Sequence, residues 1–233
     1  MKSAQARREE YVGPWLPEPV LTSEIERPDT LAERAESITL AFLVLLETLS
    51  AEERAVFLLK ETFEYEHAEI AEMLGTSVEN SRQLLHRAKE KLSRGRPRVS
   101  GTSASRRAVA ERFASAFVNG DRAALTTLLA GDVGVWSDGG GKATAARRPI
   151  LGADQVAEFF VGLHRTAKTA GALPHASLAI EDVNAEPALV VRMAGRLESI
   201  FVLSIEGGLV TAVRVVRNPD KLAHIDARLT RSH

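Results

Sequence analysis

A short basic stretch of the chain carries seven polar side chains whose chemistry suits a polyanion. Arginine offers paired donors that match guanine, asparagine and glutamine match adenine, and lysine pairs with phosphate. Apolar residues between them (Val78, Leu84, Leu85, Ala88 and Leu92) would share one helix face and pack inward, leaving the polar residues exposed. The pattern predicts a DNA-reading helix whose contacts are Ser77, Asn80, Arg82, Gln83, His86, Arg87 and Lys89.

The charge distribution supports this interpretation. Residues 31–74 contain ten glutamates against three basic residues, a net charge of −7, whereas residues 76–98 contain seven basic residues against two glutamates, a net charge of +5. The whole-chain net charge of −1 hides this switch. A basic block with helical periodicity favours a polyanionic partner.

A second set of residues could act as acids or bases if an apolar pocket enclosed them: Asp138, His164, His175 and Asp182. Their spacing defines no acid–base pair, so we expect no enzymatic activity, and we expect neither a cofactor nor a metal site. The chain lacks cysteine, which excludes disulfides and thiolate ligands and fits a reducing cytoplasm. No apolar run is long enough to cross a membrane.

The basic stretch lies in a predicted helix-turn-helix. We expect helices over 31–49, from Ser50 onward, over 64–74 and from Thr76 to about residue 93. Ser50 with Glu53, and Thr76 with Glu79, fit capping boxes, and Gly75 supplies the left-handed turn between the last two helices.

The sequence from residue 93 onward predicts a different architecture from the helix-turn-helix before it. A linker rich in serine, glycine and arginine spans 93–105, and helices follow over 104–119 and 121–130. A strand over 132–137, a helix over 154–169 and four hairpin-connected strands from residue 176 complete an α+β layout, with an antiparallel sheet curled over helices. Three prolines near the start predict an extended rod carrying Trp15.

Residues 31–95, including LSAEERAVFLLKETFEYEHAEIAEMLGTSVENSRQLLHRAKEKL, resemble region 4 of bacterial sigma factors. Three short motifs, WLPEP at 15–19, DGGGK at 138–142 and NPDKL at 218–222, resemble those of extracytoplasmic-function sigma factors with a SnoaL-like C-terminal domain. The resemblance implies two domains: an all-α helix-turn-helix bundle, then an α+β SnoaL-like cone with a curved antiparallel sheet. The implied divisions are a linker over 1–30, region 4 over 31–95, a linker over 96–104 and the SnoaL-like domain over 105–233.

The resemblance also implies a function. Region 4 would read the promoter −35 element and contact the β-flap of RNA polymerase core, and the fused domain would regulate it in cis. Region 2 is absent from this chain, so we expect no promoter opening by the chain alone. The interdomain regulatory residues would be Trp15, Leu16, Pro17, Glu18, Pro19, Asp138, Gly139, Gly140, Gly141, Lys142, Asn218, Pro219, Asp220, Lys221 and Leu222.

We expect WLPEP to lie against the other two motifs. Trp15 would supply most of the buried apolar area, and Glu18 would pair with Lys142 or Lys221. The alternative from another class is a small-molecule-binding or isomerase-like or cyclase-like cone with an accessory helical domain. A small-molecule ligand of the SnoaL-like domain is compatible with either reading.

Overall fold

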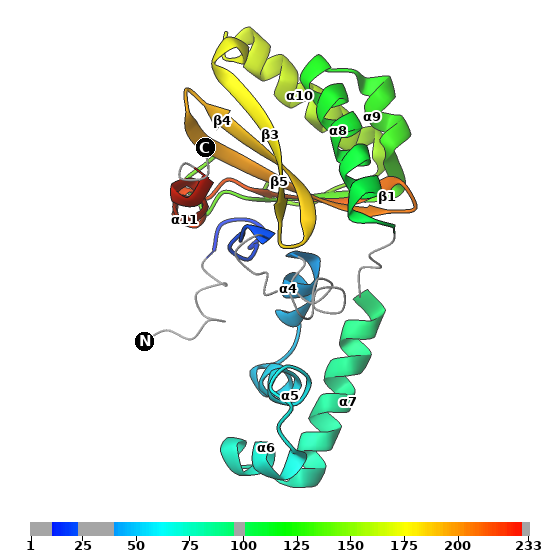
Figure 1. Ribbon diagram of the computed structural model, residues 1–233, viewed down its shortest axis with the longest axis vertical. Helices are drawn as coiled ribbons and strands as arrows, with labels where there is room; N and C mark the ends of the chain where they lie inside the picture. Colours follow the sequence, from blue (N-terminus) through cyan, green and yellow to red (C-terminus); the bar gives the residue numbers. More distant parts are fainter. Residues whose placement is uncertain (1–10, 23–39, 96–100, 230–233) are drawn as a thin grey trace. The chain divides into compact units, whose positions relative to one another are not determined.

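The computed structural model describes residues 11–22, 40–95 and 101–229, which form two compact units (Figure 1). The helical unit is Ala41–Pro97, and the sheet unit combines Met1–Leu40 with Arg98–His233. Among the described residues, no helix is both long and apolar enough to span a bilayer.

The helical unit contains α4 (Leu40–Leu46), α5 (Ala51–Glu61), α6 (His67–Leu74) and α7 (Val78–Gly95). Its buried side chains form two apolar clusters, and α7 contributes to both: Ala88 and Leu92 to one, Leu84 and Leu85 to the other. The buried face of α7 therefore holds the unit together. Of the helix predicted over 31–49, residues 31–39 lie outside the described residues.

Local capping explains where these helices begin. The predicted Ser50 box is present: the Ser50 hydroxyl accepts from the Glu53 amide at 3.1 Å, and the Glu53 carboxylate accepts from the Ser50 amide at 2.8 Å. Gly75 adopts the predicted left-handed conformation (φ 63°, ψ 37°). The prediction of Thr76 as the cap of α7 is wrong, because the Ser77 hydroxyl accepts from the Asn80 amide at 3.1 Å.

The α6 helix begins three residues later than predicted. Glu64 has a positive φ of 59°, which breaks the chain before the helix. The Glu66 amide then donates to the Glu69 carboxylate at 2.7 Å. This satisfies a backbone donor that the helix leaves free.

The sheet unit contains α8 (Ser103–Asn119), α9 (Arg122–Leu128), α10 (Ala153–Thr169), the 3-10 turn η1 (Leu173–His175) and α11 (Pro219–Leu229). Its strands are β1 (Leu129–Asp138), β2 (Ile150–Leu151), β3 (Ala176–Val183), β4 (Glu186–Met193), β5 (Arg196–Glu206) and β6 (Leu209–Val216). They form one sheet in the order β2-β1-β6-β5-β4-β3. The expectation of a wholly antiparallel sheet is wrong at one place, because β1 and β6 run parallel.

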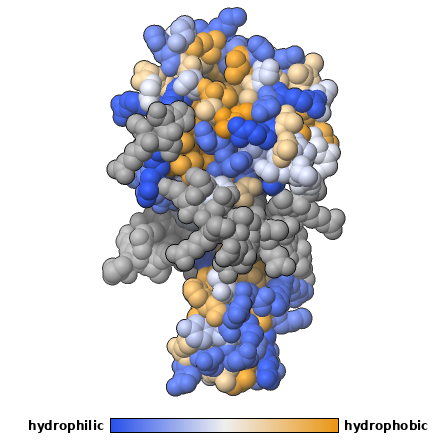
Figure 2. Space-filling model, viewed as in Figure 1, coloured by the Kyte–Doolittle hydropathy of each residue, from blue (hydrophilic) through white to orange (hydrophobic). Residues whose placement is uncertain are grey.

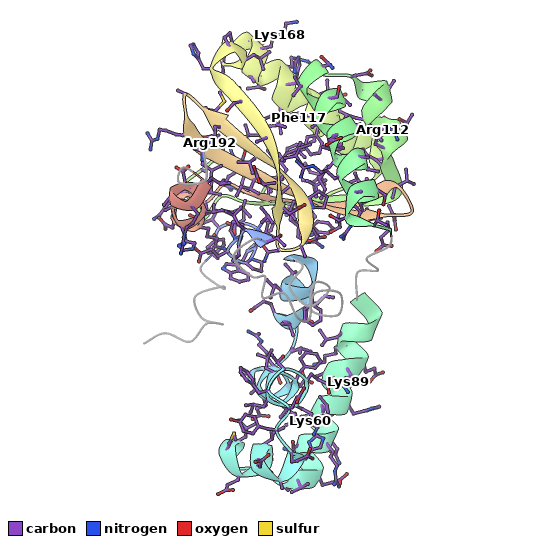
Figure 3. All side chains as sticks on the ribbon, in the orientation of Figure 1. Lys60, Lys89, Arg112, Phe117, Lys168 and Arg192 are labelled. Carbon is purple, nitrogen blue, oxygen red and sulfur yellow. The ribbon has the colours of Figure 1, made fainter. Side chains whose placement is uncertain are left out.

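One face of the sheet packs against α8, α9 and α10 (Figure 1). Four phenylalanines join these helices to the sheet: Phe113, Phe117 and Phe160 contact one another or Phe201 with ring centroids 4.9–5.9 Å apart. Phe117 is labelled among these side chains in Figure 3. Aromatic rings therefore pack between the helices and the sheet of this unit.

The opposite face of the sheet carries α11, a helix that the sequence pattern did not predict. Arg192 and Val191 alternate along β4, and Val191 packs into the core, so Arg192 points to the other face. There Arg192 pairs with Asp226 of α11 at 2.7 Å. Leu222, Ile225 and Leu229 are the buried residues of the helix.

Glu53 is a buried carboxylate that ties α5 to α7. Its two oxygens accept from the Lys91 ammonium at 2.8 and 2.7 Å. The Lys91 hydrogen bond, followed by that from the Ser50 amide, lowers the pKa of Glu53 below its ordinary 4.5.

A lowered folded-state pKa stabilises the helical unit above pH 4.5, and this contribution is lost as the pH falls through the folded value. We expect Glu53→Gln to lower the free energy of unfolding of the helical unit by about 1–2 kcal/mol at neutral pH, because it removes the charge that pairs with Lys91. The effect is modest because the Lys91 side chain is half exposed. Hydrogen exchange of the α5 and α7 amides, corrected for intrinsic rates, measures this locally. If lowering the pH reduces the exchange protection of these amides equally in wild type and in Glu53→Gln, the prediction is contradicted.

Candidate nucleic-acid interface and the docking site of the N-terminal segment

The α7 helix presents the predicted polar residues to solvent. Leu84, Leu85, Ala88 and Leu92 are buried on its other side. All seven predicted contacts are exposed: Ser77, Asn80, Arg82, Gln83, His86, Arg87 and Lys89. Val78 was predicted to pack inward, but it is 37% exposed at the first turn, before α7 enters the bundle.

Some of these side chains already have partners within the unit. Ser77 caps α7, and the Asn80 side chain donates to the Thr76 hydroxyl at 2.7 Å. Arg82 lies 3.7 Å from Glu79, and Lys89 lies 2.9 Å from Glu61. The face therefore combines exposed donors with cations held by weak surface ion pairs.

A buried hydrogen bond connects the two helices of the helix-turn-helix. The Ser81 hydroxyl on α7 is fully buried and lies 2.9 Å from Nδ1 of His67, the first residue of α6. This contact could not be predicted from the sequence, because neither residue type nor spacing marks a serine as buried. The bond helps to fix the angle at which α7 leaves the turn.

The sheet unit contains a second site, centred on the Asp138 carboxylate at the end of β1. This side chain is fully buried. It accepts from the Tyr11 hydroxyl at 2.5 Å, the Leu16 amide at 2.9 Å, the Gly140 amide at 3.0 Å and the Lys221 ammonium at 2.7 Å. A buried carboxylate is tolerated when donors and an opposite charge satisfy it in this way.

Lys221 connects this carboxylate to the N-terminal segment. Its ammonium also donates to the Leu16 carbonyl, and it lies 4.3 Å from the centroid of the Trp15 ring and 5.1 Å from that of Tyr11. Burial lowers the pKa of Lys221, and the hydrogen bond to Asp138 opposes that shift. The two rings and the carboxylate together replace the water that the ammonium has lost.

The glycines of DGGGK allow the chain to fold tightly behind Asp138. A Cβ on Gly139 would lie 2.2 Å from the Ala143 carbonyl oxygen. Gly140 has φ +59°, and a Cβ there would lie 2.3 Å from the Asn218 side-chain nitrogen. That nitrogen donates to the Tyr11 hydroxyl at 2.8 Å, so DGGGK and NPDKL meet through Tyr11.

The N-terminal segment, residues 11–22, continues from this site to the β3–β4 turn. Leu16 and Leu21 are buried. The Asn184 amide donates to the Val20 carbonyl at 2.9 Å, and the Ala185 amide donates to the Thr22 hydroxyl at 2.9 Å. As the sequence predicts, WLPEP lies against DGGGK and NPDKL.

Leu16, at 2% exposure, is buried, and Trp15 is partly buried and lies over the Lys221 ammonium. The predicted ion pairs of Glu18 are wrong, because Lys221 pairs with Asp138 and Lys142 pairs with Asp220 at 2.5 Å, whereas Glu18 is exposed.

The residues considered for acid–base chemistry do not share a site. Asp138 on β1 is committed to four donors, and four strand spacings of about 4.8 Å separate β1 from β3, where Asp182 lies. Asp182 and His175 are both exposed, at opposite ends of β3. His164 on α10 packs against Gly120.

A helix-turn-helix with an exposed basic helix, joined to a helix-and-curved-sheet unit of SnoaL-like order, defines a DNA-binding transcription factor. The family model for sigma-70 region 4 matches residues 39–92. The ECF RNA polymerase sigma factor SigJ of Mycobacterium tuberculosis is 33% identical over 95% of this chain and 73% of its own length. The probable ECF sigma factor SigI of the same species is 31% identical over 98% of this chain and 75% of its own.

The crystal structure of M. tuberculosis SigJ superposes with a TM-score of 0.69 and 32% identity, over 92% of this chain and 76% of that one. The chain belongs to the extracytoplasmic-function (ECF) sigma factors of RNA polymerase. It acts in transcription initiation, with promoter DNA and RNA polymerase as partners. The small-molecule or isomerase-like alternative is not favoured.

Tyr11 provides a spectroscopic test of the Asp138 site. Burial, followed by the hydrogen bond to Asp138, raises the pKa of Tyr11 above its ordinary 10.0. Docking is therefore favoured below pH 10.0 and weakens as the pH rises through the folded value. The chain has only one other tyrosine, Tyr65.

We expect Tyr11→Phe to remove a step in tyrosinate absorbance that lies above pH 10.0 in the wild type. Tyr65→Phe is the control and should leave that step in place. An alkaline titration followed in the near ultraviolet measures both. Ionisation of Tyr11 at or below pH 10.0 would show that its hydroxyl is not held by Asp138.

Proposed function

We propose that α7 is the promoter-reading helix and that it recognises the −35 element through Asn80, Arg82, Gln83, His86, Arg87 and Lys89, with Ser77 at its first turn. One observation carries this proposal: all seven side chains are exposed on the helix whose other face holds the bundle together. A helix anchored in this way can enter a major groove without disturbing its own unit.

The roles within this face follow from side-chain chemistry. Arg82 and Arg87 suit guanine or phosphate, Asn80 and Gln83 suit adenine, and Lys89 suits phosphate. The helical unit would also contact the β-flap of RNA polymerase core.

We propose further that the sheet unit regulates the helical unit in cis through the N-terminal segment and the three motifs that surround Asp138. The supporting observation is that a segment preceding the DNA-reading unit in sequence is held by Asp138 and Lys221, which follow that unit. Release or capture of the segment would therefore change how the helical unit is tethered.

Arg87→Ala tests the DNA-reading role. We expect weaker binding to a promoter duplex and a salt slope of the affinity that is smaller by about one, because one phosphate-binding cation is lost. Arg112→Ala, an exposed arginine of α8 labelled in Figure 3, removes the same charge from the other unit and should leave the slope unchanged. Equal slopes for wild type and Arg87→Ala would remove Arg87 from the interface.

Asp138→Asn tests the regulatory role. It leaves the partly buried Lys221 ammonium without its counter-charge, which disfavours the docked segment. With Trp136→Phe as background, Trp15 is the sole tryptophan, and its emission should shift to the red as the segment leaves. We expect DNA affinity to change with release, because the segment precedes the helical unit along the chain.

Asp132→Asn is the matched control, since it makes the same change at an exposed position of the same strand. It should alter neither the emission nor the affinity. A red shift in Asp138→Asn with unchanged DNA affinity would contradict regulation in cis while leaving the docking itself intact.

A further inference from the structure

The acidic block over 31–74 has no role in the function proposed so far. Figure 2 shows hydrophilic and apolar residues side by side on the visible face of the helical unit. Three carboxylates of the unit lie against cations of α7: Glu79 against Arg82, Glu61 against Lys89 and Glu53 against Lys91.

The Glu61–Lys89 pair has the geometry that suits a competitor of phosphate. Glu61 is the last residue of α5, and its carboxylate lies 2.9 Å from the Lys89 ammonium. The side chains remain 38% and 51% exposed, so solvent and ions reach them. Glu53, by contrast, is buried and belongs to the structural contact between α5 and α7.

Arg82 and Lys89 lie seven residues apart, so they share one edge of α7. Both cations on this edge face a carboxylate of their own unit, Glu79 at 3.7 Å and Glu61 at 2.9 Å. Figure 3 labels Lys89 on α7 and Lys60 on α5. Lys60 pairs with a different glutamate of the block, Glu66, at 3.0 Å. Glu61, at the end of α5, is the carboxylate that pairs with Lys89.

While Glu61 stays paired with Lys89, its negative charge offsets the positive charge that Lys89 offers to a DNA phosphate. We propose that Glu61, assisted by Glu79, is an intramolecular competitor of DNA phosphate that sets the affinity of α7 for any duplex. This inference rests on the proposed DNA-reading role of α7. The pair is exposed, so the expected effect is modest, about two- to fivefold in affinity.

The competitor acts on a phosphate contact, which carries no sequence information. It should therefore lower the affinity for specific and random duplexes by the same factor and leave their ratio unchanged. It should also matter most at low salt, because salt weakens the carboxylate–ammonium attraction in the free protein.

The test compares Glu61→Gln with wild type in the full chain. The probes are a duplex that wild type selects from a randomised library and a duplex of random sequence. We expect tighter binding to both, by about two- to fivefold at low salt, with a gain that shrinks as salt rises. Glu72→Gln, an exposed glutamate of the same block, is the control for net charge.

The double variant Glu61→Gln with Lys89→Gln separates competition from general repulsion. If Glu61 acts through Lys89, then Glu61→Gln has no effect once Lys89 is absent. An affinity gain that persists in the Lys89→Gln background, an equal gain from Glu72→Gln, or no gain at all would overturn the inference.

The proposed function fails in a different way. If Lys89→Gln and Arg87→Ala both leave DNA binding unchanged, α7 is not the DNA-reading helix. If these two variants weaken binding while Glu61→Gln fails to strengthen it, only the competitor role is lost. Far-ultraviolet circular dichroism and thermal unfolding of each variant exclude loss of fold as the cause.

Discussion

The burial of one carboxylate, that of Asp138, organises the sheet unit. An ionised group without water needs donors, and the nearest come from three parts of the chain: the N-terminal segment, the glycine loop that follows β1 and the first turn of α11. The need to satisfy Asp138 therefore explains why three short motifs, far apart in sequence, occur together. It also explains why the loop after β1 begins with glycines, because a Cβ on Gly139 or Gly140 would clash with its neighbours.

The helical unit depends on a simpler constraint, the division of α7 into a buried and an exposed side. Its buried residues complete both apolar clusters, which leaves the other side free for a partner. The same unit carries the carboxylates that neutralise part of that side. The proposed DNA-binding surface and its counter-charges thus come from α5 and α7 of one unit, in a chain that is nearly neutral overall but strongly polarised along its length.

Sequence patterns predicted most elements because periodicity and capping are local. The Ser50 box, the Gly75 turn and the α8 and α10 helices are in place, and α8 and α10 lie within a residue of the predicted bounds. What failed depended on tertiary context. Nothing local shows that β1 pairs parallel with β6, or that the residues after NPDKL have a sheet face to cover. The ion-pair partners of Lys221 and Lys142 could not be predicted from the sequence either. Any of several carboxylates could pair with them, and only the fold determines which ones lie nearby.

The distance along the chain between the partners of Asp138 has a consequence for biosynthesis. Leu16 lies 122 residues before Asp138 and 205 before Lys221, so its contacts close very long loops. On the ribosome, the helical unit is complete well before α11, which supplies Lys221, has been made. The nascent chain therefore passes through a stage in which a finished helix-turn-helix is preceded by a segment whose docking site is incomplete. Until α11 has been made, Tyr11, Trp15 and Leu16 lack the Lys221 ammonium that contacts all three.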